Sequence, residues 1–104
     1  MDFIERMKTV ISQGFDTTKE ALGQAADKAK ELGEKGILRF EIGQLEREAG
    51  KKFSALGGTV YRALVDEGKN TVSKGTADVK ALLMEIEDLK KRIEAKEKDL
   101  KKLK

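Results

Sequence analysis

The stretch TADVKALLMEIEDLKKRIEAKEKDLKKLK (residues 76–104) carries the clearest pattern in this chain. Its apolar positions recur at alternating steps of three and four residues, and only Lys96 interrupts them. These positions are Val79, Leu82, Ile86, Leu89, Ile93, Leu100 and Leu103. The pattern is the a/d series of a heptad, with β-branched residues at the first three a positions and leucine at most d positions. We therefore predict a heptad helix over residues 76–103.

The preceding segment, residues 37–66, is predicted to form a second helix, because its apolar residues follow the same steps. They are Leu38, Ile42, Leu45, Ala49, Phe53, Leu56, Val60 and Leu64. Between the two helices, EGKNTVSKG (residues 67–75) is typical of a loop, and Ser73 or Thr76 could cap the helix that follows. A short connection favours an antiparallel hairpin. Residues 37–104 are thus predicted to be one hairpin or coiled coil.

A row of glycines accompanies the apolar face of the segment 37–66. They are Gly36, Gly43, Gly50 and Gly57, each seven residues after the last. Glycine is unfavourable inside a helix, so a regular row indicates a packing reason, namely the close approach of another helix. Phe40, Tyr61 and Val65 lie off the main stripe and widen the apolar surface. A helix that is apolar on more than one flank contacts more than one partner, which favours oligomerisation.

Residues 1–36 show apolar or small positions every eleven residues, as in Ile4, Phe15, Ala26 and Ile37. Eleven residues make almost three helical turns, so we predict an amphipathic helix. Its first half has a bulky face, formed by Phe3, Ile4, Met7, Val10, Ile11 and Phe15. This face either packs on the hairpin or on another subunit, or lies on a membrane surface. Whether this helix continues into residues 37–66 through Gly33–Gly36 stays open.

The composition points away from catalysis. The chain has 104 residues, of which 39% are charged and 5% aromatic, and it contains no proline, cysteine or histidine. Without histidine and cysteine the usual general base, nucleophile pairs and zinc ligands are missing. Carboxylate groups such as Glu46 with Glu48, and Glu85 with Glu87 and Asp88, fall off the heptad seam and are expected in solvent. We predict no enzyme, no catalytic residues, no metal, no cofactor and no small-molecule substrate.

Charge and hydropathy limit the classes of partner and the location that we expect. The net charge is +3, and residues 69–104 hold eleven basic and seven acidic side chains. No aromatic residue lies in that segment for base stacking, so we do not expect nucleic acid as a partner. No apolar run reaches the ~20 residues that cross a bilayer, and the N-terminus has no signal-peptide pattern. The expected location is the cytoplasm, with a peripheral place at the inner membrane as the alternative.

Three resemblances add to this. The stretches TTKEA (residues 17–21) and AADKAK (residues 25–30) resemble the eleven-residue repeats of exchangeable apolipoproteins, synucleins and late-embryogenesis-abundant proteins, which coat lipid or stay flexible in water. FIERMK (residues 3–8) is similar to the first helix of the bacterial phage-shock membrane-remodelling family. From Ile37 onward, the spaced glycines followed by a heptad helix resemble small bacterial helical-hairpin proteins. That likeness implies a bacterial origin and no activity.

The sequence thus predicts an all-α chain, with an amphipathic helix at 1–36 before a hairpin at 37–104. The first function hypothesis is a structural protein that self-assembles through its helical seams into a homo-oligomer or filament. The second is a peripheral membrane protein that docks through its first helix. The third is a coiled-coil adaptor for another protein.

Overall fold

The computed structural model describes residues 2–14 and 19–103, and all regular structure in them is helical. Four α-helices follow one another along the chain, and a π-helical turn extends the third. They are α1 (Phe3–Gln13), α2 (Lys19–Glu31), α3 (Glu34–Tyr61), the π-helical turn η1 (Arg62–Asp66) and α4 (Ala77–Lys102). No strand occurs within these described ranges. The all-α class predicted from the sequence is confirmed.

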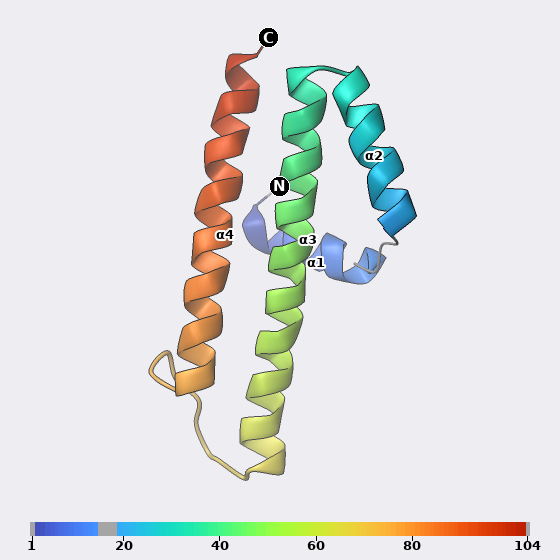
Figure 1. The fold of residues 1–104 in the computed structure, drawn as a ribbon. Helices are drawn as coiled ribbons and strands as arrows, with labels where there is room; N and C mark the ends of the chain where they lie inside the picture. The colour runs from blue at the N-terminus through green and yellow to red at the C-terminus, as the bar shows by residue number, and fades with distance from the viewer. Residues whose placement is uncertain (1, 15–18, 104) are drawn as a thin grey trace.

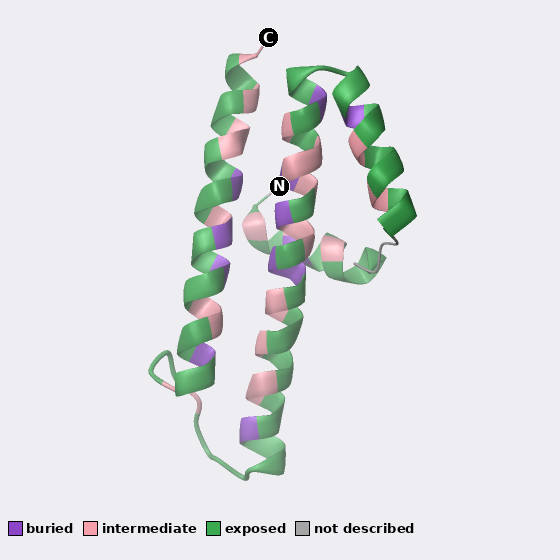
Figure 2. Ribbon diagram, in the orientation of Figure 1, coloured by how far each residue is buried: buried purple, intermediate pink, exposed green. Residues whose placement is uncertain are grey.

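The two longest helices, α3 and α4, lie side by side and run in opposite directions (Figure 1). Their facing sides hold most of the buried residues (Figure 2). Ile42, Leu45 and Ala49 of α3 join Leu89 and Ile93 of α4 in one buried cluster. Burying one such leucine or isoleucine side chain contributes about 1.5–3 kcal/mol. This apolar cluster is therefore the main cohesive element of the α3–α4 pair.

Two ion pairs mark the register of the pair. The Lys96 Nζ atom lies 3.4 Å from Glu41 Oε2, and the Lys52 Nζ atom lies 3.0 Å from Glu85 Oε2. Glu41 and Lys52 are eleven residues apart on α3, as are Glu85 and Lys96 on α4. Equal spacing in opposite chain directions is what one antiparallel register requires. Both pairs are partly exposed, so they select the register more than they stabilise the fold.

Helix α1 crosses the α3–α4 pair near its middle (Figure 1). It begins at an N-cap, where the Asp2 Oδ1 atom accepts a hydrogen bond of 2.8 Å from the backbone N–H of Glu5. Its Met7 side chain is 2% exposed and belongs to the same cluster as the α3 and α4 residues. One apolar core therefore unites three helices.

Helix α2 runs beside the N-terminal half of α3 (Figure 1). The two helices meet at a close corner, where Ala29 of α2 and Gly36 of α3 are both buried. A Cβ atom built on Gly36 would overlap the carbonyl oxygen of Ala29 and stand 2.5 Å from Cβ of Leu32. Only glycine fits this corner, which explains why the sequence has no side chain there.

The first third of the chain is not one helix, contrary to the prediction for residues 1–36. Helix α1 ends at Gly14, which has φ 81°, and α2 is separated from α3 by Gly33, which has φ 79°. Both values lie in the left-handed region that glycine adopts without strain. The same Gly33 turn shows that the first two predicted segments do not run on as a continuous helix.

The end of α3 also departs from regular helix. In η1 the backbone N–H of Glu67 donates to the carbonyl of Arg62, 2.9 Å away, which is the wider spacing of a π-helix. Ala63, three residues after Val60, is buried at 5% exposure, whereas Leu64, which the heptad steps had placed on the seam, is 41% exposed.

The connection between η1 and α4 is an ordered turn. The backbone N–H of Ser73 donates to the Thr76 hydroxyl oxygen at 3.2 Å, and that of Gly75 donates to the Ser73 hydroxyl oxygen at 3.3 Å. Thr76 holds the N-cap position of α4, but its side chain serves the turn and not the helix. The connection therefore holds α4 at a defined start.

Candidate self-association surface

The predicted seam residues are used inside the chain. Among the fifteen seam positions, seven are buried, seven are half-buried, and Leu64 is exposed. The buried ones are Ile42, Leu45, Ala49, Val79, Ile86, Leu89 and Ile93; the half-buried ones are Leu38, Phe53, Leu56, Val60, Leu82, Leu100 and Leu103. A seam that is largely covered by its own chain has little area left for a second copy.

The four spaced glycines have different environments. Gly36 is packed against α2, and Gly50 is buried. Gly43 is half-buried and Gly57 is exposed, and no atom lies within 4 Å of a Cβ built on either of them. The predicted close approach of another helix therefore occurs at Gly36, whereas the fold of the chain itself leaves open space at Gly43 and Gly57.

The predicted membrane face is divided by the docking of α1. Met7 is buried, and Phe3 and Val10 pack against the core cluster. The Phe3 ring lies 5.8 Å from the Phe53 ring, and the Lys90 Nζ atom lies 5.7 Å from the centre of the Phe3 ring.

The rest of that face points outward or is not described. Ile4 is 51% exposed and Ile11 is 39% exposed, and they lie seven residues apart on the outer side of α1. Phe15 falls outside the described residues. The central residues of the bulky face thus pack in the protein's own core. Lipid contact through that face would therefore first require α1 to leave the α3–α4 pair.

A polar junction anchors the middle of α1. The Arg6 Nη1 atom lies 2.8 Å from Glu97 Oε2 of α4. Glu46 of α3 is half-buried, and the charges of both Arg6 and Glu97 affect its pKa. Burial raises the pKa of the Glu46 carboxyl above its usual value. The guanidinium of Arg6 lowers this pKa, the carboxylate of Glu97 raises it, and Arg47 lowers it. Desolvation is the largest of these influences and decides the direction.

Glu46→Gln is expected to raise the melting temperature at neutral pH and to leave it unchanged in acid. A raised pKa means that the folded protein holds this proton more tightly than the unfolded chain does. The stabilisation is complete below the unfolded pKa of about 4.3 and is lost as the pH rises through the folded pKa. Thermal unfolding followed by circular dichroism across this range measures the effect, with Glu48→Gln on the exposed side of α3 as control. A lower melting temperature for Glu46→Gln at neutral pH would mean that attraction to Arg6 outweighs desolvation.

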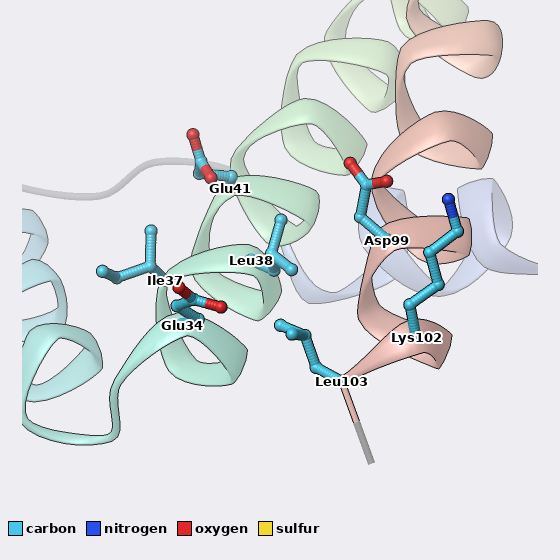
Figure 3. Close-up of a pocket in the computed structure, with 7 residues that line it drawn as sticks. All are labelled: Glu34, Ile37, Leu38, Glu41, Asp99, Lys102 and Leu103. Carbon is cyan, nitrogen blue, oxygen red and sulfur yellow. The ribbon is translucent and has the colours of Figure 1, made fainter.

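An open groove lies where the start of α3 meets the end of α4 (Figure 3). Its volume is about 430 Å³. Three carboxylates and one ammonium stand around leucine and isoleucine side chains, and Glu41 among them is paired with Lys96. The lining residues are Glu34, Ile37, Leu38, Glu41, Asp99, Lys102 and Leu103. The lining thus carries charges of both signs, with carboxylates in excess.

Chemistry-bearing clusters do not appear elsewhere in residues 2–14 and 19–103. No three acidic, histidine or cysteine side chains in that part of the chain stand close enough to hold a metal ion. Two of the acidic side chains noted in the sequence form ion pairs with basic residues. Glu85 pairs with Lys52, and Asp88 lies 3.9 Å from Arg92. None of the described helices is both long enough and apolar enough to span a membrane.

Three exposed apolar side chains lie close together at the loop end of α3 and η1. Tyr61 is 62% exposed, Val65 is 57% exposed and Leu64 is 41% exposed. Gly57 and Gly58, one turn earlier, have no atom within 4 Å of a built Cβ. We call these five residues the end strip. By helical spacing it continues the flank of α3 on which Gly36 meets α2.

The sequence contained part of the signal for the end strip. Tyr61 and Val65 stood out as apolar residues beside the main stripe, and Gly57 as a member of the glycine row. Leu64 did not, because its heptad position made it a seam residue. Steps of three or four allow either Ala63 or Leu64 to follow Val60 on the seam, and the structure buries Ala63 and leaves Leu64 exposed.

Comparison with known proteins adds no relative to this description. No protein-family model matches the chain, and neither a curated protein nor a solved structure matches it.

Proposed function

We propose that this chain is a non-enzymatic structural protein that associates with copies of itself, and that the end strip is its association surface. The observation that carries the proposal is the gathering of Tyr61, Leu64 and Val65, all exposed, beside two glycines with open space around them. Large apolar side chains grouped on a surface mark interaction sites more often than single ones do. Tyrosine is also enriched at the centres of protein interfaces.

The position of the end strip supports a helix as its partner. The same flank of α3 is covered by α2 near Gly36 and is bare from Gly57 onward. A face that already accepts one helix closely at one end can accept another at the other end. Self-association is preferred over lipid docking because the central residues of the α1 face are buried in the core. A coiled-coil adaptor role would need a seam free for another protein, but the α3–α4 seam is occupied within the chain.

The association is expected to be weak. The end strip covers about two turns of one helix, less than the ~800 Å² per partner of a standard stable interface. For a surface of this size we expect a dissociation constant on the order of 10⁻⁵–10⁻⁴ M.

Tyr61→Ser combined with Val65→Asp is expected to abolish self-association and to leave helical content unchanged. Both side chains are more than half exposed, so the fold does not depend on them, whereas a carboxylate in the interface would lose its water without gaining a partner. Sedimentation equilibrium from about 10 µM to about 1 mM, which brackets the expected dissociation constant, measures the effect.

Met84→Ser provides the matched control. Met84 is 64% exposed on α4 and is not part of the end strip, so this variant should associate as the unaltered chain does. If the unaltered chain stays monomeric over the whole concentration range, the proposal is wrong. Equal loss of association in the Met84 variant would show that general surface hydrophobicity, and not the end strip, drives assembly.

A further inference from the structure

We infer that two copies associate by antiparallel pairing of the ends of their α3 helices about a two-fold axis at Tyr61, an arrangement that rests on the self-association proposed above. The occupant of the end strip is then the end strip of a second copy. Residues at the same distance on either side of Tyr61 face each other across such an axis, because the axis reverses the chain direction.

The sizes of the side chains match this arrangement. Gly57 and Gly58 lie four and three residues before Tyr61, and Leu64 and Val65 lie three and four residues after it. Antiparallel pairing centred on Tyr61 places the bulky residues of one copy against the glycines of the other, twice. Each glycine offers open space where a Cβ would stand, so a bulky side chain can enter it.

Parallel pairing lacks this match. It would set glycine against glycine and Leu64 against Leu64, leaving a gap at one level and crowding at the next. Gaps forfeit contact energy and crowding forces strained rotamers. The two-fold arrangement also closes on itself, and so it makes a dimer and not a filament.

The glycines themselves support a packing role outside the chain. A glycine inside a helix is about 1 kcal/mol less favourable than alanine. At Gly36 the fold requires it, because a side chain would overlap α2. At Gly57 and Gly58 nothing in the described part of the chain requires it, and close approach of a second copy supplies the reason.

Because the chain contains no cysteine, single introduced cysteines report the geometry directly. A disulfide needs Cα atoms about 4.4–6.8 Å apart. Helices that pack about 8–10 Å apart, with Cα atoms about 2.3 Å from each axis, bring the two Cα atoms at the two-fold position into that range. Tyr61→Cys is therefore expected to form a disulfide-linked dimer rapidly under mild oxidation.

Two further variants distinguish the arrangements. Ser54→Cys lies on the same exposed flank but seven residues from the axis, so its two copies would stand about 20 Å apart at 1.5 Å per residue and should not cross-link. Met84→Cys reports random collision. The inference is supported if only Tyr61→Cys cross-links, at a rate at least tenfold above that of Met84→Cys.

The remaining outcomes overturn it. Cross-linking of both Ser54→Cys and Tyr61→Cys would show parallel pairing. If the reduced Tyr61→Cys variant is itself dimeric in sedimentation but cross-links no faster than Met84→Cys, a different geometry operates while self-association stands. If the unaltered chain is monomeric in sedimentation, both the geometry and the proposed function fail.

Discussion

Replacing Ile93 with alanine is expected to lower the free energy of unfolding by about 2–5 kcal/mol. The Ile93 side chain is 1% exposed, and it lies in the cluster shared by α1, α3 and α4. Removing its outer carbons takes apolar contacts from all three helices and leaves a cavity that rigid neighbours cannot fill. Because a small domain is stable by only about 5–15 kcal/mol, this single change would remove a large part of the total.

Urea unfolding followed by circular dichroism measures the loss. The control is Met84→Ala, which removes an apolar side chain of similar size from a 64% exposed position of the same helix and should change stability by no more than about 0.5 kcal/mol. If the two variants were equally stable, Ile93 would not be at the centre of the core. A reduced denaturant slope in the Ile93 variant would indicate that α1 or α2 had separated before the α3–α4 pair.

Glycine-to-alanine substitutions along α3 are expected to change stability in opposite directions. Gly36→Ala should lower stability by about 1–3 kcal/mol, the usual effect of overpacking, because its Cβ would overlap the backbone of Ala29 and cannot be relieved by a rotamer change. Gly57→Ala should raise the stability of the monomer by up to about 1 kcal/mol, since open space receives the new methyl group.

The difference in sign is the test, and it is measured by thermal unfolding of both variants at a concentration where the protein is monomeric. Gly43→Ala, half-buried but with open space, serves as a second reference and should resemble Gly57→Ala. If Gly36→Ala were as stable as the unaltered chain, α2 would not be docked closely against α3. Hydrogen exchange of the α2 amides would then be fast.

The long helices and their contact faces could be predicted from the sequence because their periodicity is long and uninterrupted. Ile42, Leu45 and Ala49 of α3, and Leu89 and Ile93 of α4, are buried in the core, and all five come from the three-and-four spacing. Such a pattern leaves few alternatives, since any other rotation of the helix would expose its apolar stripe. The observed helices begin or end within a few residues of the predicted bounds.

The first third could not be predicted as well, because the eleven-residue pattern is compatible with one helix or several. Whether a glycine interrupts a helix depends on the tertiary contacts that neighbouring residues can make when the chain turns there. At Gly33 the turn lets Ala29 of α2 reach Gly36 of α3. That gain is tertiary and has no local signature, and the same holds for the burial of Ala63 in place of Leu64 in η1.

The two ion pairs between α3 and α4 have a consequence for how faithfully the chain finds its own partner helix. On each helix a glutamate is followed eleven residues later by a lysine: Glu41 and Lys52 on α3, Glu85 and Lys96 on α4. Any two of these helices therefore match when they run in opposite directions, whether or not they belong to the same chain.

The choice between the two is then made by the short connection, residues 67–76, and not by charge. In the unfolded chain this short link is flexible, and it gives α4 an effective concentration in about the millimolar range relative to its own α3. Refolding from dilute solution should place α4 on its own α3, whereas refolding near that concentration should exchange α4 between chains. Whether α4 packs on the α3 of its own chain thus depends on how many copies of the chain fold close together at the same time.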